Sequence, residues 1–162
     1  MDIHVNGLAA YLRQPRSGST TGVLLLPTIA GVNAFVQDAA NGLAEEGFIA
    51  LAWEPYSGKP HPNGLPEALA MAKQLVDKPA LAEQSTWLTY MIEELGARRI
   101  GVLGWCLGGR YALLLPAQDD RIGASVAYHP SIEDPPFPGQ DLDSATLVGQ
   151  IRCPLQVILS LI

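Results

Sequence analysis

Short apolar runs alternate with helix-like segments along this chain, and that alternation limits the possible folds more than any other feature. Each run is continuously apolar, as expected of a strand that is buried on both faces of a parallel sheet. Strands that alternate with helices predict right-handed βαβ crossovers and an α/β fold, with a mostly parallel sheet covered by helices on both faces. The runs are GVLLLP (22–27), FIALAW (48–53), RIGVLG (99–104) and IGASVAY (122–128), and CPLQVILSLI (153–162) begins a fifth.

The segments between these runs predict three helices. The first is expected to follow a cap at Asn33 and to end at Gly47. Its buried face is predicted to hold Phe35, Ala39, Leu43 and Ala44. A longer helix is expected from Asp77 to Gly96, and a third over residues 107–117. The residues expected to share one face of the longer helix are Leu81, Leu88, Met91, Ile92 and Leu95.

The remaining segments have the composition of turns and loops. Residues 54–66 and 129–143 are rich in Pro and Gly, which predicts surface loops. Near the start, DIHV and AAYLR flank Asn6-Gly7, a dipeptide typical of a two-residue hairpin turn.

Length and charge limit the classes of protein to which the chain can belong. The 162 residues predict one domain spanning 1–162. A net charge of −6 without a basic stripe argues against a nucleic-acid or anionic-membrane partner. The chain has no apolar run of about 18 residues, and its start lacks the features of a secretory signal. We therefore expect a cytoplasmic protein, monomeric or a weak homodimer.

The segment GWCLG (104–108) carries the strongest functional signal. It fits the G-x-nucleophile-x-G pattern, and it lies between a predicted strand and a predicted helix, as that pattern requires. The turn would present the thiol of Cys106 at the N-terminus of a helix, where amide groups favour the thiolate and stabilise a developing oxyanion. The alternative interpretation is a buried structural cysteine beside packing glycines.

The chain resembles the dienelactone hydrolase family, α/β-hydrolases that use a cysteine at this turn. The resemblance covers residues 22–162, in the segments TIAGVNAFVQDAANGLAEEGFIALAWEPY, GWCLGGRYALLL and SVAYHPS. It implies hydrolysis of a small ester or lactone, with Cys106 as the nucleophile. It also implies an oxyanion hole formed by the backbone amides of Leu107 and Ile29.

The resemblance further implies a substrate pocket near this cysteine, lined by Thr28, Tyr56, Trp105 and His129. Thr28 stands where the family often has a glutamate that helps to activate the thiol. Gly58 replaces an arginine that would hold a carboxylate, and Lys59 is the nearest cation. We therefore expect a substrate other than an acidic dienelactone.

The family's catalytic acid and histidine are expected to follow the strand that begins at CPLQV. The histidines within the chain are His4, His61 and His129, and none lies in the family's sequence context for the base. His129 is interpreted as a residue at the rim of the pocket, with a role as substitute base as the alternative. We expect the 162-residue chain to lack the C-terminal strands and helices of the α/β-hydrolase fold and to be inactive by itself.

Other functions remain as alternatives. A truncated domain without catalysis could serve as a binding or assembly module through an exposed sheet edge. A flavodoxin-like domain shares the alternating pattern, but the chain has no phosphate loop or acidic phosphoacceptor cluster. Cys106 and Cys153 form no CxxC or Cys/His cluster, so neither a metal nor a cofactor is expected.

Overall fold

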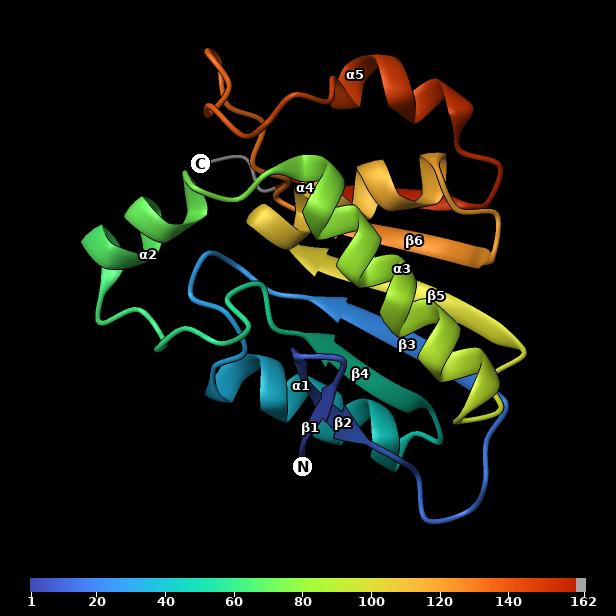
Figure 1. Ribbon diagram of the computed structural model, residues 1–162. Helices are drawn as coiled ribbons and strands as arrows, with labels where there is room; N and C mark the ends of the chain where they lie inside the picture. The colour runs from blue at the N-terminus through green and yellow to red at the C-terminus, as the bar shows by residue number, and fades with distance from the viewer. Residues whose placement is uncertain (160–162) are drawn as a thin grey trace.

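The computed structural model describes residues 1–159, whose strands form one seven-stranded sheet in the order β1-β2-β4-β3-β5-β6-β7. Strands β3 to β7 run parallel to one another, whereas β1 and β2 are antiparallel to their neighbours. The mostly parallel α/β sheet expected from the sequence is therefore confirmed (Figure 1). The strands are β1 (Asp2–Val5), β2 (Leu8–Arg13), β3 (Thr21–Leu26), β4 (Ile49–Trp53), β5 (Arg99–Trp105), β6 (Ile122–Tyr128) and β7 (Leu155–Ile158).

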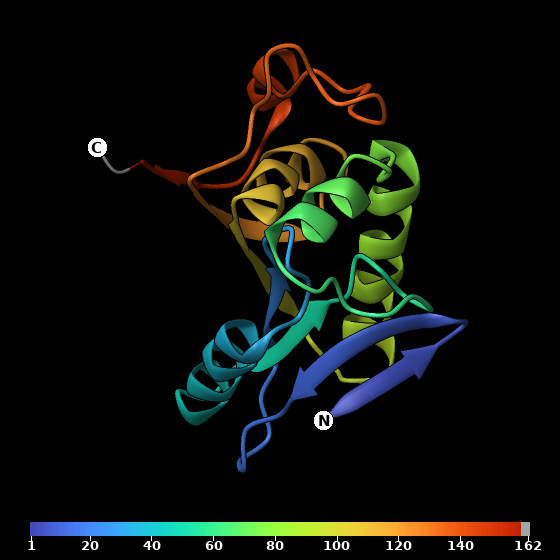
Figure 2. The ribbon, with the colours of Figure 1, turned by 90° about the vertical axis from the view of Figure 1, so that its left-hand side faces the viewer.

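Helices cover both faces of the sheet. Figure 2 shows the sheet between α1 on one side and α3 on the other. The larger core cluster joins the sheet to α3 and α4, and a smaller cluster that includes Val36 and Ala40 joins it to α1. The helices are α1 (Ala34–Glu45), α2 (Leu65–Ala72), α3 (Asp77–Glu93), α4 (Leu107–Leu114) and α5 (Ser144–Leu147), with 3₁₀ turns at Leu115–Ala117 and Val148–Gln150.

Local sequence signals set the turns as expected. Asn6 and Gly7 both have positive φ, at 53° and 82°, which closes the hairpin between β1 and β2. The Asn33 side chain accepts a hydrogen bond from the Val36 amide and caps α1. Gly47 follows α1 with a φ of 93°, as expected of a glycine that ends a helix.

The predicted buried face of α1 is correct in part, because Leu43 packs against the smaller core cluster as predicted. Val36 and Ala40 are fully buried, whereas Phe35 is 55% exposed. The Phe35 ring instead packs edge-on against Trp105, with 5.2 Å between the ring centroids. The aromatic residue is therefore at the border of the helix–sheet contact and not within it.

The longer helix differs from its prediction in two respects. It ends at Glu93, before Gly96. Leu81, Leu88 and Met91 are buried as predicted, but Ile92 is exposed.

One segment expected to be a surface loop has more structure than predicted. Within residues 54–66, Glu54 and Tyr56 are buried, and α2 begins at Leu65. The loop predicted at 129–143 contains no helix or strand, and α5, for which no helix was predicted, follows it after a cap at Asp143, whose side chain accepts a hydrogen bond from the Ala145 amide. The predicted strand 153–162 is β7 over Leu155–Ile158, and residues 160–162 lie outside the described part of the chain.

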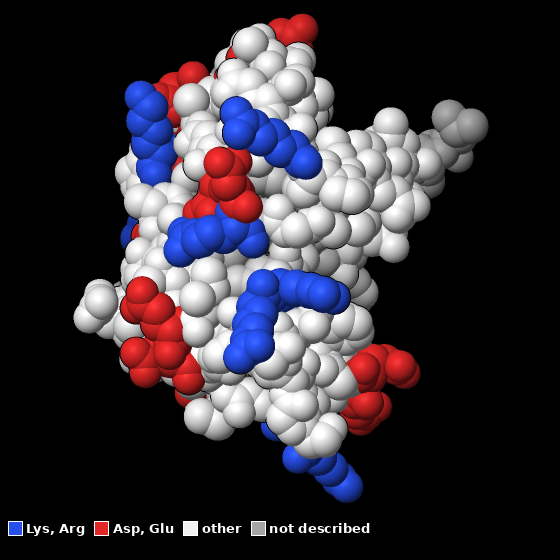
Figure 3. Space-filling view, turned by 90° about the vertical axis from the view of Figure 1, so that its right-hand side faces the viewer, with Lys and Arg blue, Asp and Glu red and all other residues white. Residues whose placement is uncertain are grey.

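Charged side chains lie on one surface of the protein in mixed clusters. Figure 3 shows Lys and Arg beside Asp and Glu on that face, without a continuous basic stripe. Arg121 and Asp119, for example, form an ion pair of 2.6 Å. None of the helices within residues 1–159 has both the length and the apolar character needed to cross a bilayer.

Candidate active site

Cys106 occupies the turn that connects β5 to α4. Its backbone has a φ of 54° and a ψ of −109°, a conformation that residues other than glycine rarely adopt. Cys106 forms no disulfide among the described residues, and the residue as a whole is half-buried. The strained strand–turn–helix context expected from the sequence is present.

The glycines around Cys106 are required by close backbone contacts. A Cβ atom at Gly104 would overlap the carbonyl group of Gly108, and a Cβ at Gly108 would overlap the carbonyl group of Leu26. A Cβ at Gly109 would lie 2.7 Å from the Tyr128 oxygen, which is also too close. Side chains at these three positions would therefore push α4 away from the sheet.

Backbone hydrogen bonds hold Cys106 from both sides. Its amide donates to the Tyr128 carbonyl oxygen at 3.0 Å, at the end of β6. Its carbonyl oxygen accepts from the amides of Ser131 at 2.9 Å and Arg110 at 3.0 Å. The position of the thiol thus depends on the ends of β5 and β6 and on the first turn of α4.

The loop after β3 meets the N-terminus of α4. The Gly108 amide donates to the Pro27 carbonyl oxygen at 2.8 Å, which brings the residues that follow Pro27 close to the turn. Leu107 is the first residue of α4, so its amide has no acceptor within the helix. The Ile29 amide takes part in none of the hydrogen bonds found among residues 1–159. The two amides expected to bind an oxyanion therefore lie on adjoining segments with their donors available.

Thr28 and Tyr56 both interact with this loop. The Thr28 hydroxyl accepts a hydrogen bond from the Ala30 amide at 3.2 Å. Tyr56 is 3% exposed, and its hydroxyl donates to the Ile29 carbonyl oxygen at 2.8 Å. Burial is the main cause that raises the pKa of the Tyr56 hydroxyl, and the nearby Glu54 and Cys106 raise it further. The hydroxyl therefore stays protonated and can donate its hydrogen bond.

Trp105 and His129 flank the turn. The Trp105 ring lies between Phe35 and Tyr128, with a centroid distance of 6.4 Å to the Tyr128 ring. His129 follows β6 with a φ of 43°, its side chain is exposed, and its amide donates to the Ile158 carbonyl oxygen at 2.8 Å. Both residues are therefore near the ends of the strands that hold Cys106.

His4 and His61 line a cavity of about 380 Å³ between the β1–β2 hairpin and the loop after β4. Tyr56 also lines this cavity, whereas Cys106 does not. Nowhere in the described part of the chain do three His, Cys, Asp or Glu side chains gather to hold a metal ion.

The sequence interpretation missed two buried charged groups near the turn. Glu54 is 7% exposed and hydrogen-bonds to the loop after β3. Arg110, in the first turn of α4, forms a buried ion pair with Asp77 at the start of α3. A single acidic residue at the end of an apolar strand and a single Arg in the apolar segment LGGRYALLL are the signals that could have drawn attention to them.

Several proteins of known sequence are similar to this chain. A Bradyrhizobium protein named as a probable 2-oxo-3-(5-oxofuran-2-ylidene)propanoate lactonase is 34% identical over 140 residues, which cover 82% of this chain and 56% of that protein. A carboxymethylenebutenolidase from Rhodococcus opacus is 33% identical over 103 residues, covering 62% of this chain and 40% of that one. The chain thus spans about half the length of these relatives.

A solved structure shows the same fold. The crystal structure of a candidate dienelactone hydrolase from Klebsiella pneumoniae superposes with a TM-score of 0.84 at 22% identity, covering 93% of this chain and 65% of that one. The sequence profile of the dienelactone hydrolase family matches residues 8–160. The strand order, the turn at Cys106 and this match agree, and the chain belongs to the dienelactone hydrolase family.

Proposed function

We propose that the protein hydrolyses small ester or lactone bonds and that Cys106 is its nucleophile. The observation that carries the proposal is the positive φ of Cys106 at the start of α4, beside a loop with an available amide. Backbone strain of this kind persists where the surrounding structure enforces it, and it is common at active sites. Family membership adds that the lactonase and carboxymethylenebutenolidase relatives are named for lactone hydrolysis.

In the proposed reaction, the Cys106 thiolate attacks the carbonyl carbon and the carbonyl oxygen becomes an oxyanion. The amides of Leu107 and Ile29 donate hydrogen bonds to that oxygen, and one such donor is typically worth about 10²- to 10³-fold in kcat. Collapse of the tetrahedral intermediate releases the alcohol group, which takes up a proton, and leaves a thioester on Cys106. Water then hydrolyses the thioester to a carboxylic acid and restores the thiol.

This reaction needs a base for the thiol and for the attacking water. The hydrogen bonds among residues 1–159 include none to the Cys106 sulfur. The family resemblance assigns the acid and histidine to positions after β7, so we propose that the 162-residue chain alone does not turn over ester. Activity should accordingly be measured on the full-length protein.

We propose a neutral ester or lactone as the preferred substrate, with Trp105 and His129 at the pocket. Lys59 is exposed and lines the cavity beside Glu54, which Cys106 does not line. Gly58, which stands at the position of the family's arginine, offers no cationic side chain. Lys59, the nearest cation, lines a cavity that does not include Cys106, so we do not expect it to bind a substrate carboxylate at the thiol.

The test compares p-nitrophenyl acetate turnover by the full-length protein and its cysteine variants. Cys106→Ala should lower kcat/KM by at least about 10³-fold, since loss of one member of a nucleophile–base set typically costs several orders of magnitude. Cys153→Ala is the matched control and should retain wild-type turnover. Unchanged turnover in Cys106→Ala would refute the nucleophile assignment.

A further inference from the structure

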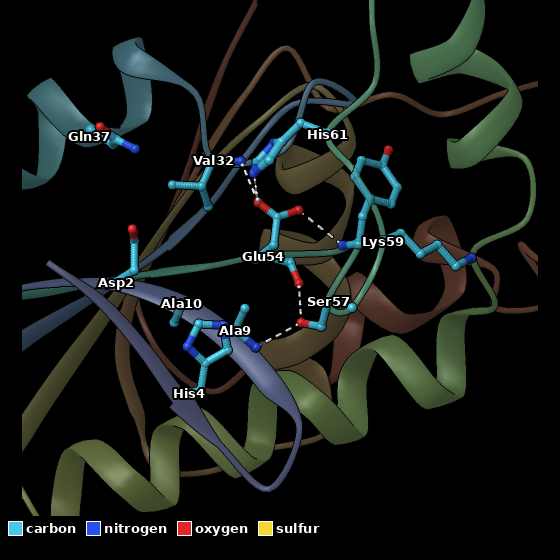
Figure 4. Close-up of a pocket in the computed structure, with 12 residues that line it drawn as sticks. Asp2, His4, Ala9, Ala10, Val32, Gln37, Glu54, Ser57, Lys59 and His61 are labelled. Atoms are coloured by element: carbon cyan, nitrogen blue, oxygen red, sulfur yellow. Dashed lines mark hydrogen bonds and ion pairs between the residues drawn. The ribbon is translucent and has the colours of Figure 1, made fainter.

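Two buried residues that follow β4, Glu54 and Tyr56, form hydrogen bonds to the loop after β3. Glu54 comes directly after β4, and both oxygens of its carboxylate are used. Oε2 accepts a hydrogen bond from the Val32 amide at 3.0 Å, and Oε1 accepts from the Tyr56 amide at 3.0 Å. Figure 4 shows the Glu54 carboxylate pointing toward Val32, with His61 on the same side. One carboxylate thus connects the end of β4 to the loop after β3.

Gly31 allows this close approach. Its φ is 70°, and a Cβ atom at this position would lie 2.9 Å from Oε1 of Glu54. Both the backbone conformation and the available space therefore favour glycine here. The loop is fitted closely to the carboxylate behind it.

Tyr56 provides the second attachment. Its hydroxyl donates to the Ile29 carbonyl oxygen at 2.8 Å, while its own amide is held by Glu54. The carbonyl of Ile29 and the amide of Val32 are thereby fixed at the two ends of a short loop segment. The Ile29 amide donates no hydrogen bond within residues 1–159, so it is available to bind a substrate oxygen.

We propose that Glu54 and Tyr56 are positioning residues that hold the loop 28–33 so that the Ile29 amide binds the oxyanion. This inference rests on the proposed function for its catalytic meaning, but the attachment itself is independent of it. Preorganised donors stabilise a transition state because they need no reorganisation when charge develops. A loop held at only one end would lose that advantage without losing the substrate's other contacts.

His61 is a further polar neighbour of the Glu54 carboxylate. His61 Nε2 lies 3.6 Å from Oε2 of Glu54, but its side chain is 59% exposed. The two amide hydrogen bonds are the buried contacts, so they are expected to carry most of the attachment. His61→Ala should therefore change kcat by less than about twofold, because His61 is largely exposed and both buried amide hydrogen bonds to Glu54 remain.

The experiment uses Glu54→Gln, Glu54→Ala and Tyr56→Phe in the full-length protein. Tyr56→Phe keeps the buried ring and removes one hydrogen bond, so it tests the idea with little risk to folding. The matched controls are Tyr11→Phe, which removes a hydroxyl bonded to Asn41 at 3.1 Å, and Glu83→Gln, which alters a carboxylate bonded to Trp53 at 3.0 Å. Three readouts are needed: amide hydrogen exchange in residues 28–33, kcat and KM with p-nitrophenyl acetate, and alkylation of Cys106 by iodoacetamide.

We expect amide exchange in residues 28–33 to rise at least about tenfold in Tyr56→Phe and Glu54→Gln, and further in Glu54→Ala. The value of kcat should fall about 10- to 100-fold, because displacement of one oxyanion donor costs at most what its removal costs. KM should stay within about threefold, and Cys106 alkylation, which needs no oxyanion hole, should keep its rate. The two controls should match the wild-type protein in all three readouts.

Unchanged exchange in residues 28–33 would overturn the inference whatever the activity. A higher KM with unchanged kcat would also overturn it, because Tyr56 would then be a substrate contact. If exchange rises as expected while Cys106→Ala retains full turnover, the loop attachment stands and the proposed nucleophile is wrong. The failures of the two proposals are therefore distinguishable.

Discussion

Arg110 and Asp77 form an ion pair with 2.6 Å between Nη2 and Oδ2, and both side chains are almost completely buried. The same Asp77 oxygen accepts the Leu142 amide at 3.0 Å, and Arg110 donates to the Leu142 carbonyl oxygen at 2.8 Å. Because Arg110 also donates its amide to the Cys106 carbonyl, this ion pair connects the cysteine turn to α3 and to the loop before α5.

Loss of either partner of this ion pair should strongly destabilise the protein. We expect Arg110→Met to lower the free energy of unfolding by about 3–5 kcal/mol, because a buried carboxylate is left without its counter-ion. Urea unfolding monitored by tryptophan fluorescence measures the change. Lys78→Met is the control: Lys78 lies 3.8 Å from Asp141 on the surface, and such pairs contribute about 0–1 kcal/mol. Equal effects in the two variants would contradict the prediction.

A methyl group at Gly108 should displace α4 from the sheet. We expect Gly108→Ala to prevent stable folding or to lower the unfolding midpoint sharply, because its Cβ would overlap the carbonyl group of Leu26. The matched control is Gly42→Ala on α1, where no atom lies within 4 Å of the added Cβ. That control should gain up to about 1 kcal/mol from helix propensity. Thermal unfolding compares them, and a Gly108→Ala midpoint near that of the wild type would disprove the predicted overlap.

The two free cysteines should differ in their rates of alkylation. Burial raises the pKa of the Cys153 thiol, so less of it is present as the reactive thiolate at neutral pH. Cys106 lies at the N-terminus of α4, where amide dipoles favour negative charge. We expect iodoacetamide at pH 7 to modify Cys106 first, as measured by peptide mass spectrometry. Cys106→Ala should remove the fast phase and Cys153→Ala should retain it, whereas the reverse pattern would contradict the assignment.

Acid should remove the contribution of Asp119 to stability. Hydrogen bonds from Arg121 hold the pKa of the Asp119 carboxyl below its ordinary value of 3.8. A group whose pKa is lower in the folded protein stabilises it fully above the ordinary value, and that stabilisation is lost as the pH falls through the folded-state value. We therefore expect Asp119→Asn to lower the free energy of unfolding at pH 7 and to have little effect in strong acid. Urea unfolding across this pH range measures the difference.

Glu83 provides a comparison of opposite sign. Burial raises the pKa of its carboxyl, so ionisation of Glu83 costs stability as the pH rises through the folded-state value. Glu83→Gln should therefore gain stability relative to the wild type as the pH rises from acid to neutral. If the Asp119 and Glu83 variants followed the same pH trend, the assigned pKa directions would be wrong.

Local patterns in the sequence were sufficient to predict the strands, the hairpin and the cysteine turn. Buried parallel strands are continuously apolar and can be recognised from that pattern. The residue types at Asn6-Gly7 and at Gly104 to Gly108 are those that the hairpin turn and the cysteine turn require. Phe35 was wrongly assigned to the buried face of α1, because this apolar residue packs on the border of the sheet, against Trp105. Helix α2 was missed because it begins at Leu65 and Pro66, directly after a loop rich in Pro and Gly.

The buried polar contacts depend on pairs of residues far apart in the chain. Glu54 is 22 residues from Val32, and Arg110 is 33 from Asp77, so neither pair produces a periodic signal. Tyr56 was expected to line a substrate pocket; that interpretation remains a prediction, and the hydrogen bond to Ile29 was not foreseen. Such contacts can be identified only once the three-dimensional structure is known.

The hydrogen bond from Ser131 to Cys106 marks a boundary for protein engineering. Residues up to Ser131 anchor the backbone of the cysteine, whereas residues 132–136 are exposed. Glu133 accepts a hydrogen bond from the Ser131 hydroxyl at 2.6 Å, so it is coupled to the residue that anchors the cysteine. A library that keeps Glu133 and varies the other exposed residues of 132–136 would leave both the backbone anchor and this side-chain contact in place.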